Sequence, residues 1–141
     1  MSKSFRTQRR VEFRDTDAAG LMHFTAFFTK MEEVEHEFLR HLGFSVVMYD
    51  GTAKLSWPRV SAKCDYTGAT RFEDLLDLEL RISRLGEKSV TYDIAFSLGE
   101  QSIATGQVIT VYCRIEPDVP PRSLPIPKEM TEGMQPYALA E

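Results

Sequence analysis

Residues 11–43 read VEFRDTDAAGLMHFTAFFTKMEEVEHEFLRHLG, and this stretch decides the fold class. Its first part, up to residue 24, is a strand-like run that ends in two acids and small residues. Its second part predicts one amphipathic helix, because apolar residues recur at helical spacing within about 140° of a helical wheel. These are Phe24, Phe27, Phe28, Met31, Val34, Phe38, Leu39 and Leu42, with Lys30, Glu33, Glu37 and Arg40 on the opposite side.

The ends of this helix are also marked in the sequence. Thr25 is the expected N-cap, and Gly43 is the expected C′ residue at which the helix ends. The segment between them would give about nineteen residues and a rod of roughly 28 Å. A rod of that length can run across a whole small sheet.

Strand-like patterns lie on both sides of the helix. A first strand is expected at residues 5–13, and after a loop at 44–56 further strands are expected at 60–66, 76–83, 89–98 and 103–115. Turn residues at 67–68, 86–87 and 99–100 predict that these strands are consecutive antiparallel neighbours. Prolines from 117 to 127 end the sheet, and residues 128–134 suit a short helix. The pattern predicts an α+β fold in which an antiparallel sheet of about five strands wraps around a long central helix.

Composition excludes several classes of function. The 141 residues are expected to form one domain, 1–141, with 43% hydrophobic and 27% charged residues. A formal net charge of −4 implies no general attraction to nucleic acid or to an anionic membrane, and no apolar run reaches the length of a membrane span. Cys64 and Cys113 lie in strand-like runs without a metal-binding neighbour, so we expect buried free thiols and a cytoplasmic protein.

The acids before the helix are the first candidates for chemistry. Asp15 and Asp17 lie close to a predicted helix N-terminus, whose free N–H groups attract developing negative charge. A carboxylate beside backbone donors is what hydrolysis of an acyl bond requires. The same two acids are also consistent with a pair that only shapes a turn. Gly20 follows where a positive φ or close approach of a ligand is expected.

The Asp-x-Asp-x-x-Gly pattern at residues 15–20 resembles that of the 4-hydroxybenzoyl-CoA thioesterase group of hot-dog-fold proteins. The resemblance covers nearly the whole chain, including EFLRHLG at 37–43 and the closing segment 115–127. It implies a hot-dog fold and hydrolysis of an acyl-CoA thioester, with coenzyme A as part of the substrate and no cofactor. By this resemblance Asp17 is the nucleophile or general base, the backbone N–H of Phe24 is the oxyanion donor, and Asp15 holds the loop.

Further residues are assigned to the substrate site by the same resemblance. His23 is expected to pack against the substrate or a partner, and Phe27 to line an aromatic or a medium aliphatic acyl pocket. Lys88 and Arg84, around the turn between the third and fourth strands, are the expected contacts of the CoA phosphates. The histidines show no metal-ligand spacing, so no metal is expected.

Glu35 breaks the helical pattern, since it falls in the middle of the apolar stripe. A buried carboxylate is costly unless it is paired or protonated. One interpretation is an ion pair to Arg59 or Lys63 across the contact between helix and sheet. The other is a second carboxylate in the acyl pocket.

A single wrapped sheet leaves edge strands that need a partner, which predicts a homodimer or a homotetramer made from dimers. Two alternatives to the CoA hydrolase stay open. One is a related enzyme that acts on acyl-carrier protein or catalyses hydration. The other is a non-catalytic acyl-CoA-binding or scaffold protein.

Overall fold

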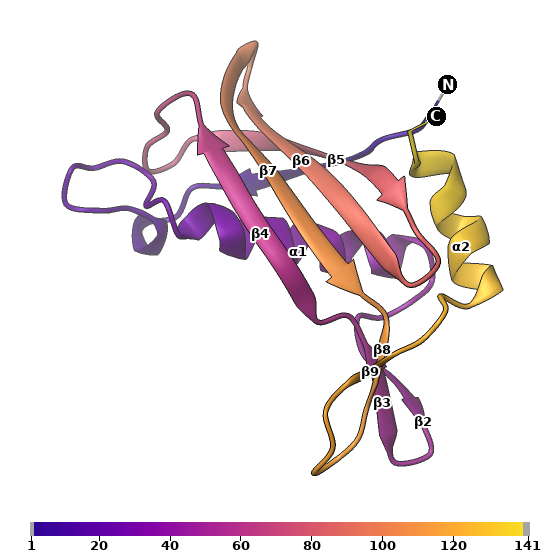
Figure 1. Ribbon diagram of the computed structural model, residues 1–141. Helices are drawn as coiled ribbons and strands as arrows, with labels where there is room; N and C mark the ends of the chain where they lie inside the picture. Colours follow the sequence, from indigo (N-terminus) through magenta and orange to yellow (C-terminus); the bar gives the residue numbers. More distant parts are fainter. Residues whose placement is uncertain (1, 140–141) are drawn as a thin grey trace.

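The computed structural model describes residues 2–139 and contains a five-stranded antiparallel sheet that packs against the helix α1 (Figure 1). The strand order is β1-β5-β6-β7-β4. The strand bounds are Phe5–Arg10 for β1, Arg59–Tyr66 for β4, Leu75–Leu85 for β5, Ser89–Leu98 for β6 and Gln101–Val111 for β7. The predicted α+β class and the antiparallel five-stranded sheet are therefore confirmed.

The helix α1 spans Ala26–His41, sixteen residues rather than the nineteen expected. It begins directly after Thr25, whose side chain makes no capping hydrogen bond. At its end Gly43 has a φ of +90°, and its N–H donates to the carbonyl of Arg40 at 2.9 Å. Such a left-handed residue closes a helix without the steric cost that a side chain would add.

The core lies between α1 and the inner face of the sheet. Buried apolar side chains come from α1 and from alternate positions of the strands, as period-two burial requires. The largest fully buried ones include Trp57, Tyr92, Phe38, Phe96, Met31, Leu39, Leu76, Leu78, Leu80 and Ile82. Two helix predictions are wrong: the side chain of Phe24 is exposed, and Lys30, placed on the polar side by the wheel, is buried.

The predicted neighbour relation of β4 is wrong as well. β4 pairs with β7 and not with β5, because β1 occupies the free side of β5, with Phe5 opposite Leu80. The segment between β4 and β5 is a loop, in which the N–H groups of Thr67 and Gly68 donate to the carbonyl of Ile103. β4 therefore forms one edge of the five-stranded sheet.

A second, four-stranded sheet was not predicted. It has the order β2-β3-β8-β9 and projects beyond the first sheet (Figure 1). Its strands are Met48–Asp50, Ala53–Ser56, Cys113–Ile115 and Arg122–Ser123. Half of it comes from the segment predicted as loop, and β8 comes from the run 103–115, which the structure breaks at Tyr112.

The short helix α2, Lys128–Met134, has the bounds that the sequence predicted. Two 3-10 turns complete the fold, η1 at Phe13–Asp15 and η2 at Gln135–Tyr137. The first strand therefore ends at Arg10 rather than at Phe13. In the part of the chain that the structure describes, no helix has the length and apolar character to cross a membrane.

Candidate active site

The acidic segment before α1 folds into a small hairpin. The N–H of His23 donates to the carbonyl of Asp15 at 2.7 Å, and the N–H of Asp17 donates to the carbonyl of Leu21 at 2.8 Å. The hairpin therefore places both acids on one short ladder that leads directly into the helix.

Asp17 lies in the tight turn of this hairpin and is exposed. Its Oδ1 accepts hydrogen bonds from the N–H groups of Ala19 at 2.9 Å and Leu21 at 3.2 Å. The N–H of Gly20, which has a φ of +78°, donates to the Asp17 carbonyl at 3.0 Å, so the predicted positive φ is confirmed. Within residues 2–139 no partner contacts Oδ2 of Asp17. One carboxylate oxygen is thus held by the turn, while the other has no partner among the described residues.

Asp15 is buried and takes part in an ion pair that the sequence did not reveal. The ammonium group of Lys30 lies 3.2 Å from its Oδ2, and both side chains are less than a tenth exposed. The same oxygen accepts the N–H of Glu12 at 2.8 Å. Because its carbonyl also accepts the N–H of His23, Asp15 connects the start of η1, the helix and the hairpin.

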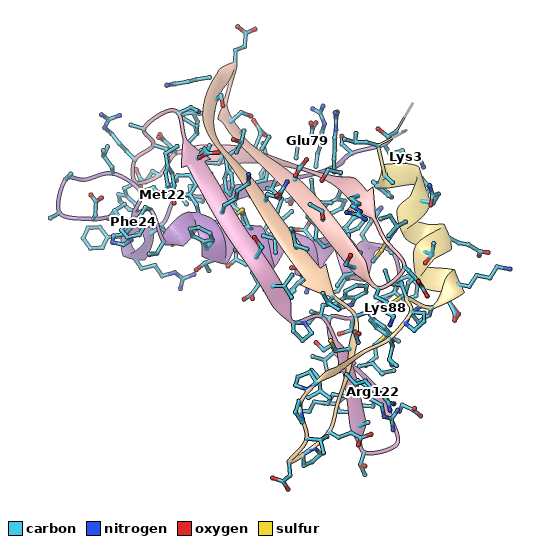
Figure 2. All side chains as sticks on the ribbon, viewed as in Figure 1. Lys3, Met22, Phe24, Glu79, Lys88 and Arg122 are labelled. Atoms are coloured by element: carbon cyan, nitrogen blue, oxygen red, sulfur yellow. The ribbon has the colours of Figure 1, made fainter. Side chains whose placement is uncertain are left out.

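Phe24 lies in the turn that leads into α1, two residues before the helix begins (Figure 2). Its N–H has no acceptor among residues 2–139, so it is available to a ligand. Its carbonyl accepts a hydrogen bond from the hydroxyl of Tyr66 at 2.9 Å. This bond ties the turn to the end of β4 and fixes the direction of the peptide groups around it. Its ring is 60% exposed and stacks on that of His23, with centroids 4.5 Å apart.

The ring of His23 is held by the start of the helix. Its Nδ1 accepts the N–H of Thr25 at 3.2 Å and lies 2.6 Å from the Thr25 hydroxyl. A backbone donor on Nδ1 requires that this nitrogen be unprotonated, so the neutral ring carries its proton on Nε2. Phe27, assigned to the acyl pocket, instead packs edge-on between Tyr66 and Phe96, each at 5.1 Å, and is 3% exposed.

Glu35 forms a second polar centre, farther along α1. Its side chain is 1% exposed, and Oε1 lies 2.5 Å from a guanidinium nitrogen of Arg59, which is the ion pair that the sequence suggested. Glu32 also approaches this guanidinium, at 3.5 Å. The Oε2 of Glu35 is buried and has no hydrogen-bond partner within residues 2–139. Burial raises the pKa of Glu35 to about 7, helped by the charge of Glu32 and opposed by Arg59.

A cavity of about 190 Å³ opens beside this carboxyl group. It is lined by Phe28, Glu32, Glu35, Arg59, Ala62 and Val108, from α1, β4 and β7. Nearby in the core, the hydroxyl of Tyr92 is buried and has no hydrogen-bond partner in the described part of the chain, and burial together with the charge of Glu35 raises the pKa of Tyr92. The region therefore holds more polar groups than the surrounding protein satisfies.

The predicted phosphate contacts lie away from the Asp17 turn. Lys88 is at the turn between β5 and β6, at the opposite end of the sheet from Phe24 (Figure 2), and Arg84 is close to it at the end of β5. Within one protomer, neither is near the acidic hairpin. Exposed cations beside the hairpin include Arg14, in η1, and Arg71, which pairs with Leu21 in an isolated β-bridge. Across the described part of the chain, no cluster of three His, Cys, Asp or Glu side chains could hold a metal.

The comparison with known families agrees with this architecture. The family model described as the thioesterase-like superfamily matches residues 11–134, and the chain belongs to that superfamily. The chain is 30% identical to the 1,4-dihydroxy-2-naphthoyl-CoA hydrolase of Acaryochloris marina, over 94% of this chain and 96% of the relative. It is 29% identical to the hydrolase of the same name from Synechococcus elongatus, over 93% and 95%.

The fold also matches that of a solved structure. The gentisyl-coenzyme A thioesterase BH1999 superposes with a TM-score of 0.77 at 25% identity, over 93% of this chain and 99% of that one. The hot-dog fold that the sequence resemblance implied is thereby confirmed.

Proposed function

We propose that this protein hydrolyses an acyl-CoA thioester to a free acid and coenzyme A. The observation that carries the proposal is that the hairpin with Asp17, which has a carboxylate oxygen without a partner among residues 2–139, leads directly into the turn with the unpaired N–H of Phe24 before α1. Membership of the thioesterase-like superfamily supports it. The relatives named above act on dihydroxynaphthoyl and gentisyl esters, so hydroxylated aromatic acyl groups are the first class of substrate to test.

Two routes are chemically balanced for this arrangement. As a general base, Asp17 takes a proton from water while the water oxygen attacks the thioester carbonyl, and the proton leaves with the CoA thiolate. As a nucleophile, Asp17 attacks the carbonyl itself and expels the thiolate, and water then cleaves the mixed anhydride. In both routes the N–H of Phe24 stabilises the oxyanion, and one such donor contributes on the order of 10²–10³ in rate.

We also propose that the protein is a homodimer joined through β4. This strand is one of the two edges of the five-stranded sheet, and its side chains are mostly exposed, with Val60 63% exposed. A free, partly apolar edge is a template for pairing with another strand, and a second copy of the same strand satisfies it with two-fold symmetry. A tetramer would follow from association of two such dimers.

The CoA phosphates need cations near the open side of the hairpin. Arg14 and Arg71 meet this requirement within one protomer, and neither is in an ion pair with another residue of 2–139. Lys88 and Arg84 meet it only if a partner protomer brings them close. Replacing Arg71 by Gln should therefore raise KM for an acyl-CoA more than it lowers kcat, because it removes binding and not chemistry.

The decisive experiment measures thiol release from a panel of acyl-CoA esters by the protein and by Asp17→Asn. The variant keeps the shape of the side chain, and a lost general base should lower kcat by about 10²–10⁴-fold with little change in KM. Asp118→Asn is the matched control, since Asp118 is exposed in a remote turn where its φ of +64° suits Asn.

Other outcomes identify the alternatives. Full turnover by Asp17→Asn would refute the mechanism. Binding of CoA esters without turnover by the unaltered protein would indicate a non-catalytic acyl-CoA-binding or scaffold protein. Product masses that show hydration, or cleavage of acyl-carrier-protein esters alone, would indicate the related enzymes.

A further inference from the structure

We propose that the exposed rings of Phe13 and Phe72 bind the adenine base of coenzyme A, beside Arg14 and Arg71, which bind its phosphate groups. This inference rests on the proposed thioesterase function and names the residues that hold the nucleotide half of the substrate.

Exposed phenylalanines gather at the end of the sheet where the Asp17 hairpin lies. Three of the nine phenylalanines are exposed, namely Phe13 in η1, Phe24 before α1 and Phe72 in the loop before β5. The rings of Phe13 and Phe72 are 76% and 47% exposed and meet edge to face, with centroids 5.9 Å apart and planes at 88°. Two large rings in water forgo the free energy that burial would supply. Such a pair therefore indicates a surface that a ligand or a partner covers.

Backbone hydrogen bonds hold the segments that carry the two rings. The loop of residues 70–74 lies beside the hairpin before α1 (Figure 1), and the N–H of Met22 donates to the carbonyl of Thr70 at 2.8 Å. On the other side of the loop, the N–H of Val11 donates to the carbonyl of Asp74, also at 2.8 Å. Inside the loop, Oδ2 of Asp74 accepts the hydroxyl of Thr70 at 2.9 Å. A surface that is held in place before the ligand arrives loses little conformational entropy on binding.

The chemistry around the rings suits a nucleotide. An aromatic face binds a purine base by stacking. Arg14 and Arg71 directly follow and precede the two phenylalanines in the sequence, and both are exposed. Neither forms an ion pair within residues 2–139. Guanidinium groups bind phosphate oxygens through paired hydrogen bonds. In an acyl-CoA only the nucleotide combines an aromatic base with phosphate groups, so it is the part that fits this surface.

The separation from the reacting end also suits coenzyme A. Asp15 lies directly opposite His23 in the hairpin. Phe13 is two residues before Asp15, and Phe24 directly follows His23, so the Cα atoms of Phe13 and Phe24 are at most about 15 Å apart. The pantetheine arm has about twelve bonds between the thioester sulfur and the first phosphate, and it spans up to about 14 Å at the rise per bond of a peptide chain. An ester with its carbonyl at the Phe24 N–H can therefore place its nucleotide beside Phe13 and Phe72 of the same protomer.

Esters with and without the nucleotide test the assignment. We would measure thiol release from one acyl group carried on coenzyme A and on N-acetylcysteamine, which keeps the thioester but lacks the phosphates and the base. Phe13→Ala should lower kcat/KM for the CoA ester by about fivefold to a hundredfold, the effect of one lost base stack, mainly through KM. It should leave cleavage of the N-acetylcysteamine ester unchanged, and Phe13→Trp, which restores an aromatic face, should recover the preference for the CoA ester. Tyr49→Ala is the matched control, because Tyr49 is 69% exposed but lies in β2 of the small sheet.

Direct binding gives a second readout that does not depend on turnover. Adenosine 3′,5′-bisphosphate has the base and phosphates of this nucleotide without the arm, and its binding can be followed by titration calorimetry. Arg14→Gln and Arg71→Gln should each weaken this binding by about tenfold, the effect of a lost hydrogen bond to a charged group. Phe13→Ala and Phe72→Ala should weaken it as well, and added salt should do the same because exposed charges are screened.

The outcomes separate this inference from the function on which it rests. Cleavage of both esters that depends on Asp17, with an unchanged preference for the CoA ester in Phe13→Ala and Phe72→Ala, would overturn only the inference. Cleavage of neither ester would overturn the proposed function, while the binding of adenosine 3′,5′-bisphosphate would still test the two rings. If Phe13→Ala does not fold, the comparison is made with Phe13→Leu, which keeps an apolar side chain without an aromatic face.

Two further results would contradict the assignment. A preference for the CoA ester that is lost in Lys88→Gln but kept in Phe13→Ala would place the nucleotide at the opposite end of the sheet. An equal loss on both esters in Phe13→Ala would show that the ring does not act on the nucleotide. If the mass by light scattering also changed in that variant, the two rings would be an interface between copies of the chain.

Discussion

Replacing Lys30 by Met removes the cation that faces Asp15 and leaves the apolar stem of the side chain in place. The ammonium group lies 3.2 Å from Oδ2 of Asp15, and the two side chains are 5% and 9% exposed. Met is close to Lys in length, so packing against the core of α1 should change little. The variant therefore keeps the buried carboxylate of Asp15 but lacks its ionic partner.

Breaking a buried ion pair from one side costs about 3–5 kcal/mol, because the surviving charge stays in a poor environment without compensation. We expect Lys30→Met to lower the free energy of unfolding by about this amount at pH 7. Removal of both charges in Asp15→Asn/Lys30→Met should cost clearly less than the sum of the two single changes, since the double variant buries no unpaired charge.

Urea unfolding of the three variants and the unaltered protein measures this, with tryptophan fluorescence and circular dichroism as two probes of one transition. Lys128→Met is the control, because its ion pair with Glu132 is exposed, with an N–O distance of 3.7 Å. An exposed pair of this kind contributes about 0–1 kcal/mol. A loss below about 1 kcal/mol in Lys30→Met, or strict additivity in the double variant, would refute the view that a buried charge pair anchors the hairpin.

Three further predictions follow from single contacts. Gly106→Ala should lower the free energy of unfolding by about 1–3 kcal/mol, because the added Cβ atom would lie 2.1 Å from Sδ of Met31. An unchanged midpoint of thermal unfolding would contradict this. Tyr66→Phe should cost about 1 kcal/mol and lower kcat, because the Phe24 carbonyl loses its donor; a loss of stability with full kcat would show that the bond does not position the amide. The pKa of Glu35 lies near 7 in the folded protein and 4.5 in the unfolded chain, so the folded state binds more protons between these values. The free energy of unfolding of the unaltered protein should therefore fall by about 3 kcal/mol relative to that of Glu35→Gln as pH rises from 4.5 to above 7. A difference between the two proteins that does not change with pH would contradict this.

Local patterns predicted the elements that local interactions determine. The bounds of α2 and the end of α1 at Gly43 follow from residues that are adjacent in sequence, and the hairpins of β5, β6 and β7 follow from their short turns. The pairing of β4 with β7 was missed because a turn signal at residues 67–68 indicates a change of direction but not the next neighbour. The small sheet was missed for a related reason, since its strands of two to four residues are too short to show a period.

The candidate site also shows that local sequence patterns predict local features and miss contacts between distant residues. Asp17 and Gly20 could be identified from the sequence, because the turn that they form is local and its chemistry is contained in adjacent residues. Lys30 was placed on the solvent side, because a helical wheel describes one element and contains no information on a buried acid fifteen residues earlier. Glu35 was recognised as an exception, yet its role depends on Arg59 from β4 and on a cavity that exists only once the sheet is formed.

Lys30 and Glu35 are the charged residues on the buried face of α1. Lys30 is the charge that holds Asp15, and Asp15 in turn holds the hairpin that carries Asp17. Glu35 lines the small cavity that Arg59 also lines, and the two residues form an ion pair. A helix selected only to cover a sheet would carry apolar residues at both positions, as the rest of its buried face does. The departure from the amphipathic pattern at Lys30 therefore falls where the proposed chemistry needs a charge to hold the hairpin of Asp17, which is where a fold is expected to give up local consistency.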